Sequence, residues 1–359
     1  MSYKIKIEKN SVSKIHEVDF NNIPFGRVFS DHMFVVDFID GAWKDPRIIP
    51  FQNLSMHPST SALHYGQAIF EGLKAYKDHS GNIQIFRPEK NIQRMNRSAE
   101  RMAMPQISEE LFLNAMTELI KLDQEWIPTS EGASLYIRPF MFATDEYVGI
   151  KASENYKFVI FTCPVQAYYS QPVKVKIAEK YVRAFPGGTG TAKAAGNYAG
   201  TLYPVNLAKQ EGYDQILWMD AKEFKYLQEI GTMNIFIQIG DKIITPDLSQ
   251  GTILEGITRD SVLQLLHDWD IEVEERRITI DEVVEAYNKN ELKDAFGTGT
   301  AATISHISNI GYKNKNLILP DPESRIISNR IKDELNKIKL SRAEDKYNWM
   351  YKINLEATV

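Results

Sequence analysis

The strongest constraint on the fold is a nearly unbroken apolar run, "KFVIFTCPV", at residues 157–165. A run of this length and composition predicts a strand at the centre of a sheet that is covered on both faces. The polar stretch "AYYSQP" follows it, and "VKVKIAEKYVRAF" resumes a strand at residue 173. We therefore expect an N-terminal domain at 1–166, an inter-domain linker at 167–173 and a C-terminal domain at 174–359.

Hydrophobic periodicity predicts a mixed fold, α+β in the first half and α/β in the second. In the first half, strands are expected at 72–77, 83–88 and 133–143, and helices at 89–103 and 108–122. In the second half, strands are expected at 173–185, 214–220, 232–239 and 241–246, and helices at 258–269 and 280–288, with Thr279 and Glu282 as a capping box before the latter. A C-terminal helix carries an apolar stripe of Ile327, Ile331, Leu335 and Ile338.

Composition narrows the class of protein. The chain has 359 residues, 43% of them apolar, with 42 Lys+Arg against 47 Asp+Glu and a net charge of −5. It lacks the basic excess of a nucleic-acid binder. No run approaches the about 18 apolar residues of a membrane span, and no signal peptide is recognisable. Cys163 is the single cysteine, so we expect no internal disulfide and a cytoplasmic location, with this thiol as a small buried residue.

The segment "GGTGTAKAAGNY", residues 187–198, contains one lysine, Lys193, among small residues. Small neighbours allow backbone or a flat ligand to approach closely, so this amine is either placed for chemistry or lies in a flexible loop. The same pattern returns as "GTGTAA" at 297–302. Chance, or two tight turns that face an anion, explains the repetition.

Several familiar motifs are excluded. Lys193 lacks the flanking glycine and hydroxyl residue of a phosphate-binding P-loop. A strand rather than a helix is expected after "GTGTAA", which removes the dinucleotide-binding interpretation. The seven histidines show no metal-ligand spacing, and no G-x-S-x-G elbow is present. Schiff-base chemistry with an aldehyde cofactor such as pyridoxal phosphate remains for Lys193.

Such a cofactor needs an anion cradle, an acid beside its ring nitrogen and a donor to its phenolic oxygen. Candidates are the expected helix start in "GITRDS" at 256–261, Glu229 and Tyr198. Each has a purely structural alternative, respectively a plain helix N-terminus, a solvated edge glutamate and a core tyrosine. The residues alone leave both interpretations open.

Several motifs together resemble one family. They are "SALHYGQAIFEGLKAY", "SLYIRP", "GGTGTAKAAGNY", "EIGTMNIF", "EGITRDS" and "FGTGTA", in this order. Their order and spacing resemble those of branched-chain amino acid aminotransferases. The resemblance extends from about residue 24 to residue 353. It implies the two-domain, D-amino acid aminotransferase-like architecture of fold type IV enzymes, with pyridoxal 5′-phosphate as cofactor.

The resemblance also implies the cofactor residues. Lys193 would be the Schiff-base lysine and catalytic residue, Tyr198 the partner of the phenolic oxygen, and Glu229 the partner of the ring nitrogen. The phosphate would be held by Arg94, the backbone amides of Ile257 and Thr258, and the hydroxyl of Thr300.

Substrate residues follow in the same way. Arg138, helped by Tyr65, would meet the side-chain carboxylate of glutamate, and Phe70 and Tyr168 would line the apolar pocket. The α-carboxylate would go to the amides of Thr300 and Ala301 with the Tyr136 hydroxyl. The substrates implied are leucine, isoleucine and valine with 2-oxoglutarate, in a homodimer without nucleic-acid or membrane partners.

Other functions remain open. A D-amino acid aminotransferase or an aminodeoxychorismate lyase would keep Lys193 and Glu229 but change the substrate residues, and a phosphate-sensing binding protein would use the same turns without catalysis. Ala302 and Ser305 stand where some relatives carry a C-x-x-C redox switch, so we expect no such regulation. Pro204 should delay or kink the helix expected after Tyr198.

Overall fold

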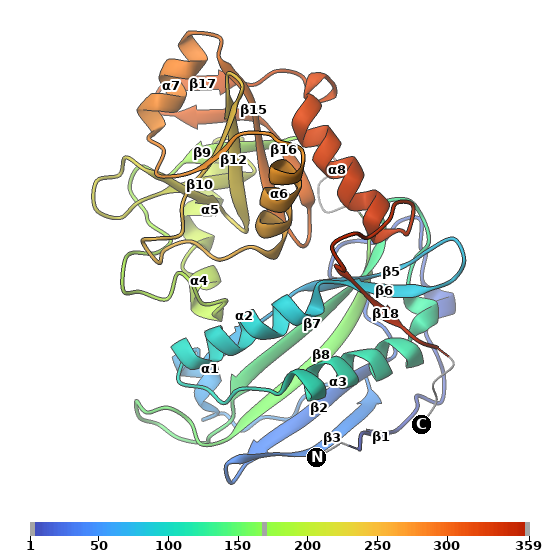
Figure 1. Cartoon of the computed structure of the whole chain (residues 1–359). Coiled ribbons are helices and arrows are strands. Elements are labelled where there is room, and N and C mark those ends of the chain that lie inside the picture. The colour runs from blue at the N-terminus through green and yellow to red at the C-terminus, as the bar shows by residue number, and fades with distance from the viewer. Residues whose placement is uncertain (1–3, 167–170, 356–359) are drawn as a thin grey trace. The chain divides into compact units, whose positions relative to one another are not determined.

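The computed structural model describes residues 4–166 and 171–355. Residues 167–170 of the predicted linker, Tyr168 among them, lie outside this part. The chain divides into two compact units (Figure 1). Unit 1 contains Met1–Tyr168, Ala192–Gly196 and Lys337–Val359, and unit 2 contains Tyr169–Thr191 and Asn197–Asn336. Lys193 therefore belongs to unit 1, although the segments on either side of it in sequence belong to unit 2.

Unit 1 is built on a mostly antiparallel sheet in the order β1-β3-β2-β8-β7-β5-β6-β18, with β4 paired to β7. The apolar run at 157–165 forms most of β8, which lies between β2 and β7, so its central position is confirmed. The strands are β1 (Lys6–Ile7), β2 (His32–Ile39), β3 (Ala42–Pro50), β4 (Ala68–Phe70), β5 (Leu73–Lys77), β6 (Ile83–Phe86), β7 (Ser134–Ala143), β8 (Tyr156–Val165) and β18 (Met350–Ile353).

Two helices cover one face of this sheet, α2 (Pro88–Arg101) and α3 (Glu109–Leu122) (Figure 1). Proline opens α2, where its missing N–H is harmless. The Ser108 side chain caps α3 by accepting from the backbone N–H of Leu111 at 3.2 Å. Shorter helices are α1 (Ser61–Tyr65) and the 3-10 turns η1 (Ile15–Glu17) and η2 (Gln124–Trp126). Cys163 is buried as expected, and burial raises the pKa of its thiol to about 11.

Unit 2 has a second sheet, in the order β11-β10-β9-β16-β15-β12-β13-β14, with β17 paired to β16. Because β11 pairs with both β10 and β12, six of these strands close on themselves. The strands are β9 (Val173–Ile177), β10 (Gln215–Met219), β11 (Leu227–Ile230), β12 (Met233–Ile239), β13 (Lys242–Thr245), β14 (Val273–Glu275), β15 (Leu292–Gly299), β16 (Thr303–Tyr312) and β17 (Lys315–Ile318).

The helices of unit 2 agree with most of the predicted ranges. They are α4 (Ala195–Ala199), α5 (Leu202–Gln210), α6 (Ile257–Asp268), α7 (Ile280–Asn288), α8 (Ile326–Lys339) and the 3-10 turn η3 (Pro322–Ser324). The beginning of α4, up to Gly196, and the end of α8, from Lys337, are assigned to unit 1. Ile331, Leu335 and Ile338 of the α8 stripe are buried, as predicted. Pro204 lies in the first turn of α5, after a break from α4, so the predicted disruption of this helix is confirmed.

Two local predictions need correction. The strand expected at 173–185 ends at Ile177, because the following residues form a loop instead of continuing the ladder. The capping box at α7 is only half formed. The Thr279 hydroxyl accepts from the Glu282 N–H at 3.0 Å, but the Glu282 carboxylate binds Arg276, at 2.6 Å from Nη2. A guanidinium partner replaces the backbone donor that the box would use.

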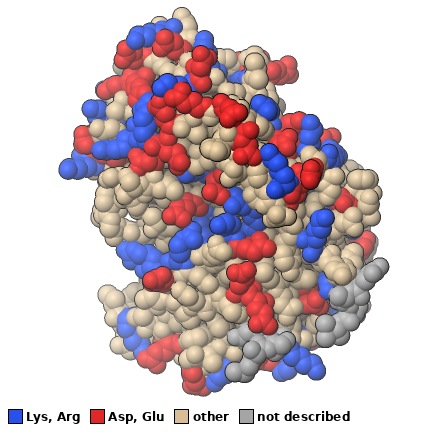
Figure 2. Space-filling model, in the orientation of Figure 1, with Lys and Arg blue, Asp and Glu red and all other residues tan. Residues whose placement is uncertain are grey.

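The surface carries both signs of charge. Lys and Arg side chains occur together with Asp and Glu across the face shown in Figure 2, as the nearly balanced composition suggests. Among the described helices, none combines the length and the apolar character needed to cross a membrane.

Candidate active site

Lys193 is placed in unit 1 by its small neighbours. Ala192 and Ala194 are buried in the core of that unit, and Ala194 forms a bridge with Ile69 of β4. The Lys193 carbonyl accepts from the N–H of Phe70 at 3.1 Å, and its N–H donates to Ser98 Oγ at 2.9 Å. The segment thus lies along β4 like a short extra strand. Larger residues beside the lysine would prevent this approach.

Phe70 connects Lys193 with Arg138. The Lys193 Nζ lies 4.7 Å from the centre of the Phe70 ring, and the Arg138 Cζ lies 4.8 Å from the same centre. Both cations therefore lie near one aromatic ring within unit 1. The arrangement brings the predicted Schiff-base amine close to the predicted carboxylate receptor.

Arg138 has capacity to bind an anion. Its Nη2 donates to the Tyr136 hydroxyl at 3.1 Å, and its Cζ lies 5.3 Å from the Tyr136 ring. The Nε is buried and has no hydrogen-bond partner among the described residues. No carboxylate in the described part of the chain forms an ion pair with this guanidinium. A buried donor without an acceptor is costly, and an oxygen of a bound anion would satisfy it.

Gly72 explains part of the "FEGLKAY" motif. A Cβ at this position would lie 2.1 Å from the Tyr136 hydroxyl oxygen, so only glycine leaves room for that hydroxyl. Tyr65, expected to help Arg138, lies on α1 and is 44% exposed, with its ring tilted against that of His64 and the ring centres 4.2 Å apart. Within this chain, no described contact joins Tyr65 to Arg138. Tyr168 falls outside the described residues.

Arg94 pairs with a carboxylate that the sequence did not point out. Its Nε and Nη2 donate to the two carboxylate oxygens of Glu71 at 2.7 and 2.8 Å, and Asn91 donates to the same carboxylate at 2.7 Å. Burial by itself raises the pKa of Glu71, but Arg94, Lys193 and the hydrogen bonds hold it below its usual value. The ionised Glu71 fixes Arg94 in one orientation.

In unit 2, Glu229 is a buried carboxylate on β11. Its Oε1 lies 2.7 Å from Arg183 Nη1, and the side chains of Glu229 and Arg183 are 5% and 4% exposed. The backbone N–H of Leu254 donates to the same oxygen at 3.4 Å. Glu229 is therefore not the solvated edge glutamate of the structural alternative. An opposite charge so close favours the ionised carboxylate.

The residues of unit 2 that are predicted to bind the phosphate lie at the start of α6 and in the turn after β15. Ile257 and Thr258 open α6, whose N-cap, Gly256, offers no side-chain hydrogen bond. A Cβ on Gly256 would lie 1.9 Å from Asn234 Oδ1, so glycine leaves room for that amide side chain. Thr300 and Ala301 form the turn between β15 and β16. The positive end of the helix dipole at this start suits an anion.

Tyr198 lies in the short helix α4, five positions after Lys193, and is partly buried. No group of three or more potential metal ligands occurs among the described residues.

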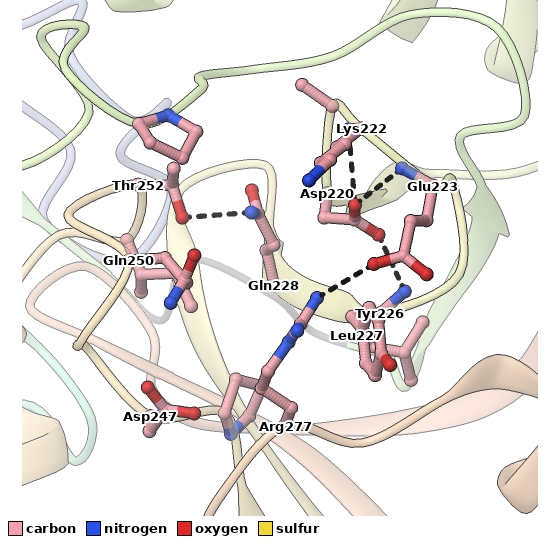
Figure 3. A pocket seen from close by; sticks show the side chains of 14 residues that line it. Asp220, Lys222, Glu223, Tyr226, Leu227, Gln228, Asp247, Gln250, Thr252 and Arg277 are labelled. Carbon is pink, nitrogen blue, oxygen red and sulfur yellow. Dashed lines mark hydrogen bonds and ion pairs between the residues drawn. The ribbon is translucent and has the colours of Figure 1, made fainter.

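A separate pocket of about 140 Å³ is lined by Leu227 and Gln228 of β11 together with surrounding loops (Figure 3). Gln228 lines it and donates to Thr252 Oγ1 at 2.9 Å, while Glu229, the next residue, points to the opposite face as strand alternation requires. None of the predicted site residues lines this pocket. It is therefore distinct from the surroundings of the predicted cofactor residues.

The sequence interpretation missed Glu71, Arg183 and Ser98. The only local signal for Glu71 was a carboxylate between an apolar strand and a glycine. Arg183 lay in a segment interpreted as a strand. Ser98 comes directly after residues that were assigned to the polar face of the helix expected at 89–103. In the structure it is buried, and its hydroxyl donates to the Arg94 carbonyl at 3.0 Å.

Comparison with known proteins defines the class first. Residues 68–310 match the family model described as amino-transferase class IV, and the chain belongs to this family. The predicted family and the fold type IV class are thereby confirmed.

Individual relatives are more specific. Branched-chain-amino-acid aminotransferase 2 of Bacillus subtilis (strain 168) is 46% identical over 349 residues, which cover 96% of each chain. Branched-chain-amino-acid transaminase 1 of the same organism is 44% identical and covers 98% of this chain and 100% of its own. The crystal structure of a branched-chain aminotransferase from Thermoproteus uzoniensis with norvaline matches with a TM-score of 0.74 and 26% identity, covering 90% of this chain and 100% of that one.

Proposed function

We propose that this protein is a branched-chain amino acid aminotransferase. It would transfer the amino group of leucine, isoleucine or valine to 2-oxoglutarate, with pyridoxal 5′-phosphate held covalently by Lys193. The observation that carries the proposal is the Phe70 ring, near which both the Lys193 amine and the Arg138 guanidinium lie. The near full-length similarity to two branched-chain aminotransferases supports the same reaction.

The donor set suits a phosphorylated pyridine aldehyde. An aldehyde needs an amine, which is Lys193, and a protonated ring nitrogen needs a carboxylate, which is Glu229 paired with Arg183. A phosphate suits the start of α6, where the helix dipole is positive and the N-cap is a glycine, together with Arg94 and Thr300. Tyr198 would donate to the phenolic oxygen. When bound, the cofactor supplies the electron sink that makes the substrate Cα proton labile.

The chain's own residues would then position the substrate and move one proton. The Lys193 amine would take up and move the proton that leaves the substrate Cα. Glu229 would hold a proton at the ring nitrogen. Tyr136 and the amides of Thr300 and Ala301 would orient the α-carboxylate.

Acceptance of both leucine and glutamate follows from the pair of Phe70 and Arg138. The aromatic ring, with Tyr168 as a further predicted contact, provides apolar surface for a branched side chain. The guanidinium, with its buried Nε, provides a partner for a carboxylate that would otherwise be too costly to desolvate.

We further propose at least a homodimer, in the cytoplasm. In unit 1, residues 56–65 and 145–150 are joined by the Thr60–Glu146 bridge, and together they expose Met56, Leu63, Tyr65, Tyr147, Val148 and Ile150. Ile150 is 94% exposed. A cluster of exposed apolar side chains favours burial against another copy. Light scattering tests this proposal, and a monomer at every concentration would contradict it.

The half-reaction tests the function directly. Purified protein saturated with pyridoxal phosphate is mixed with each branched-chain amino acid, with glutamate and with D-alanine, and the cofactor absorbance is followed. Leucine, isoleucine, valine and glutamate should all convert the cofactor, and D-alanine should not. Conversion by D-alanine alone favours a D-amino acid aminotransferase, and no visible chromophore favours a non-catalytic phosphate-binding protein.

A further inference from the structure

Arg183 contacts three separate segments of unit 2. Its Nη1 lies 2.7 Å from Glu229 Oε1 and donates to the carbonyl oxygen of Thr252 at 2.9 Å. Its Nη1 and Nη2 each donate to the carbonyl oxygen of Gly190 at 3.2 Å. The guanidinium is thus fixed by two backbone carbonyls as well as by the carboxylate. Because the planar guanidinium is held by three partners, a small movement of one partner alone does not reorient it.

The loop that Arg183 holds leads directly to Lys193. Gly190 is three residues before the lysine, and a Cβ on Gly190 would lie 2.7 Å from both the Thr252 carbonyl oxygen and the Ala184 Cβ. This close packing leaves the Gly190 carbonyl little freedom. Arg183 therefore links the segment before the predicted Schiff-base lysine to the strand that carries the predicted acid.

Arg183 also acts on Glu229 through its charge. A buried carboxylate is costly in its charged form unless a cation is close, and the Arg183 charge lies at hydrogen-bond distance. The cation lowers the affinity of Glu229 for a proton. A proton shared between Glu229 and a ring nitrogen then stays on the nitrogen. Charges would alternate from guanidinium to carboxylate to protonated ring.

We infer that Arg183 is a positioning residue for the proposed reaction, because it holds Glu229 ionised and oriented so that the cofactor's ring nitrogen keeps its proton. The inference rests on the proposed function. Arg183 itself would touch neither substrate nor cofactor.

Arg325 provides a matched control for a purely structural arginine. It also forms a buried ion pair, with Asp294 at 3.0 Å and both side chains 1% exposed, and it also donates to backbone carbonyls, among them that of Ile307 at 2.9 Å. It contacts none of the predicted site residues in the described structure. Its loss should lower stability without changing the ring nitrogen.

The test uses the full chain reconstituted with pyridoxal phosphate that carries ¹⁵N in its ring. The ¹⁵N resonance and the visible absorbance are followed against pH for wild type, Arg183→Met, Arg183→Lys and Arg325→Met. In Arg183→Met, Glu229 should take up a proton at higher pH, moving the acid transition of both signals upward by about one pH unit or more. Arg183→Lys should move it less because it keeps the charge. Arg325→Met should leave it in place.

Unchanged acid transitions in Arg183→Met, or equal shifts in Arg325→Met, would overturn the inference. If Arg183→Met does not fold, the comparison of Glu229→Gln with Glu229→Gln/Arg183→Met decides. Both variants lack the carboxylate through which Arg183 would act, so they should give the same ¹⁵N resonance. A further change in the double variant would show that Arg183 acts without Glu229. A wild-type protein that binds no pyridoxal phosphate would refute the proposed function itself, which is a separate outcome.

Discussion

Two buried arginine–glutamate pairs support predicted cofactor residues, one in each unit, and they are built in opposite ways. In unit 1 the predicted ligand is the arginine, Arg94, and the supporting Glu71 is fully buried and bonded by Arg94, Asn91 and the Gly72 N–H. In unit 2 the predicted ligand is the glutamate, Glu229, and the supporting Arg183 is held by backbone carbonyls. The charge of the expected ligand group explains the inversion, since a phosphate calls for a cation and a protonated ring nitrogen calls for an anion. In each pair, the supporting residue of opposite charge fixes the orientation of the predicted ligand residue.

The largest expected effect concerns the amine that both pairs would serve. Lys193→Ala should abolish essentially all turnover and the visible absorbance of the bound cofactor, because no other group would form the covalent link. Half-reactions and absorption spectra measure both losses. Thermal unfolding of the apoprotein is the control, and a variant that kept turnover and chromophore would remove the central assumption of the comparison.

The two pairs should differ in their contribution to stability. Glu71→Gln deprives the buried Arg94 of its two-point carboxylate partner, so it should cost about 3–5 kcal/mol of unfolding free energy. Glu229→Gln should cost less, about 1–3 kcal/mol, because Arg183 keeps two carbonyl acceptors. Urea unfolding of both apoproteins measures the difference, and equal costs would contradict the distinction between the pairs.

The pH dependence of stability provides the control for the Glu71→Gln prediction. Its pKa is lowered from 4.5 in the folded protein, so ionised Glu71 stabilises the folded state above that value. This contribution is lost as the pH falls through the folded pKa. The stability gap between wild type and Glu71→Gln should therefore be constant down to about pH 5 and narrow below it.

Arg138 sharpens the comparison because no described carboxylate supports it. Arg138→Met should weaken the glutamate and 2-oxoglutarate half-reaction by about 2–5 kcal/mol of transition-state binding and spare leucine. Separate kcat/KM values for the two half-reactions test this selectivity. Equal losses would mean that Arg138 binds the α-carboxylate or only supports the fold.

The smallest expected effect lies away from both pairs. Thr279→Ala removes the hydroxyl that caps α7 and should cost about 1 kcal/mol of stability, with no change in either half-reaction. Thermal unfolding and the leucine half-reaction measure the two quantities. A loss of activity larger than the loss of stability would show that α7 is coupled to the site.

Local patterns were sufficient for several parts of the molecule. The apolar run that forms β8, the helices α2, α3, α6 and α7, and the buried stripe of α8 followed from periodicity and end signals. The strand expected at 173–185 was too long because the alternation of apolar and polar residues continues past Ile177 into a loop. That loop contains Arg183 and leads to the segment before Lys193. Roles of individual residues came from the family resemblance, since a single motif left a structural alternative open in each case.

By itself the sequence determined the element types and the chemical groups available, because backbone periodicity and side-chain chemistry are local properties. It did not determine which charges pair. Glu71 meets Arg94, and Arg183 meets Glu229, through contacts between residues distant along the chain. Only the tertiary structure brings these groups out of water to hydrogen-bond distance. Desolvation there turns an ordinary glutamate or arginine into a fixed support for a binding residue.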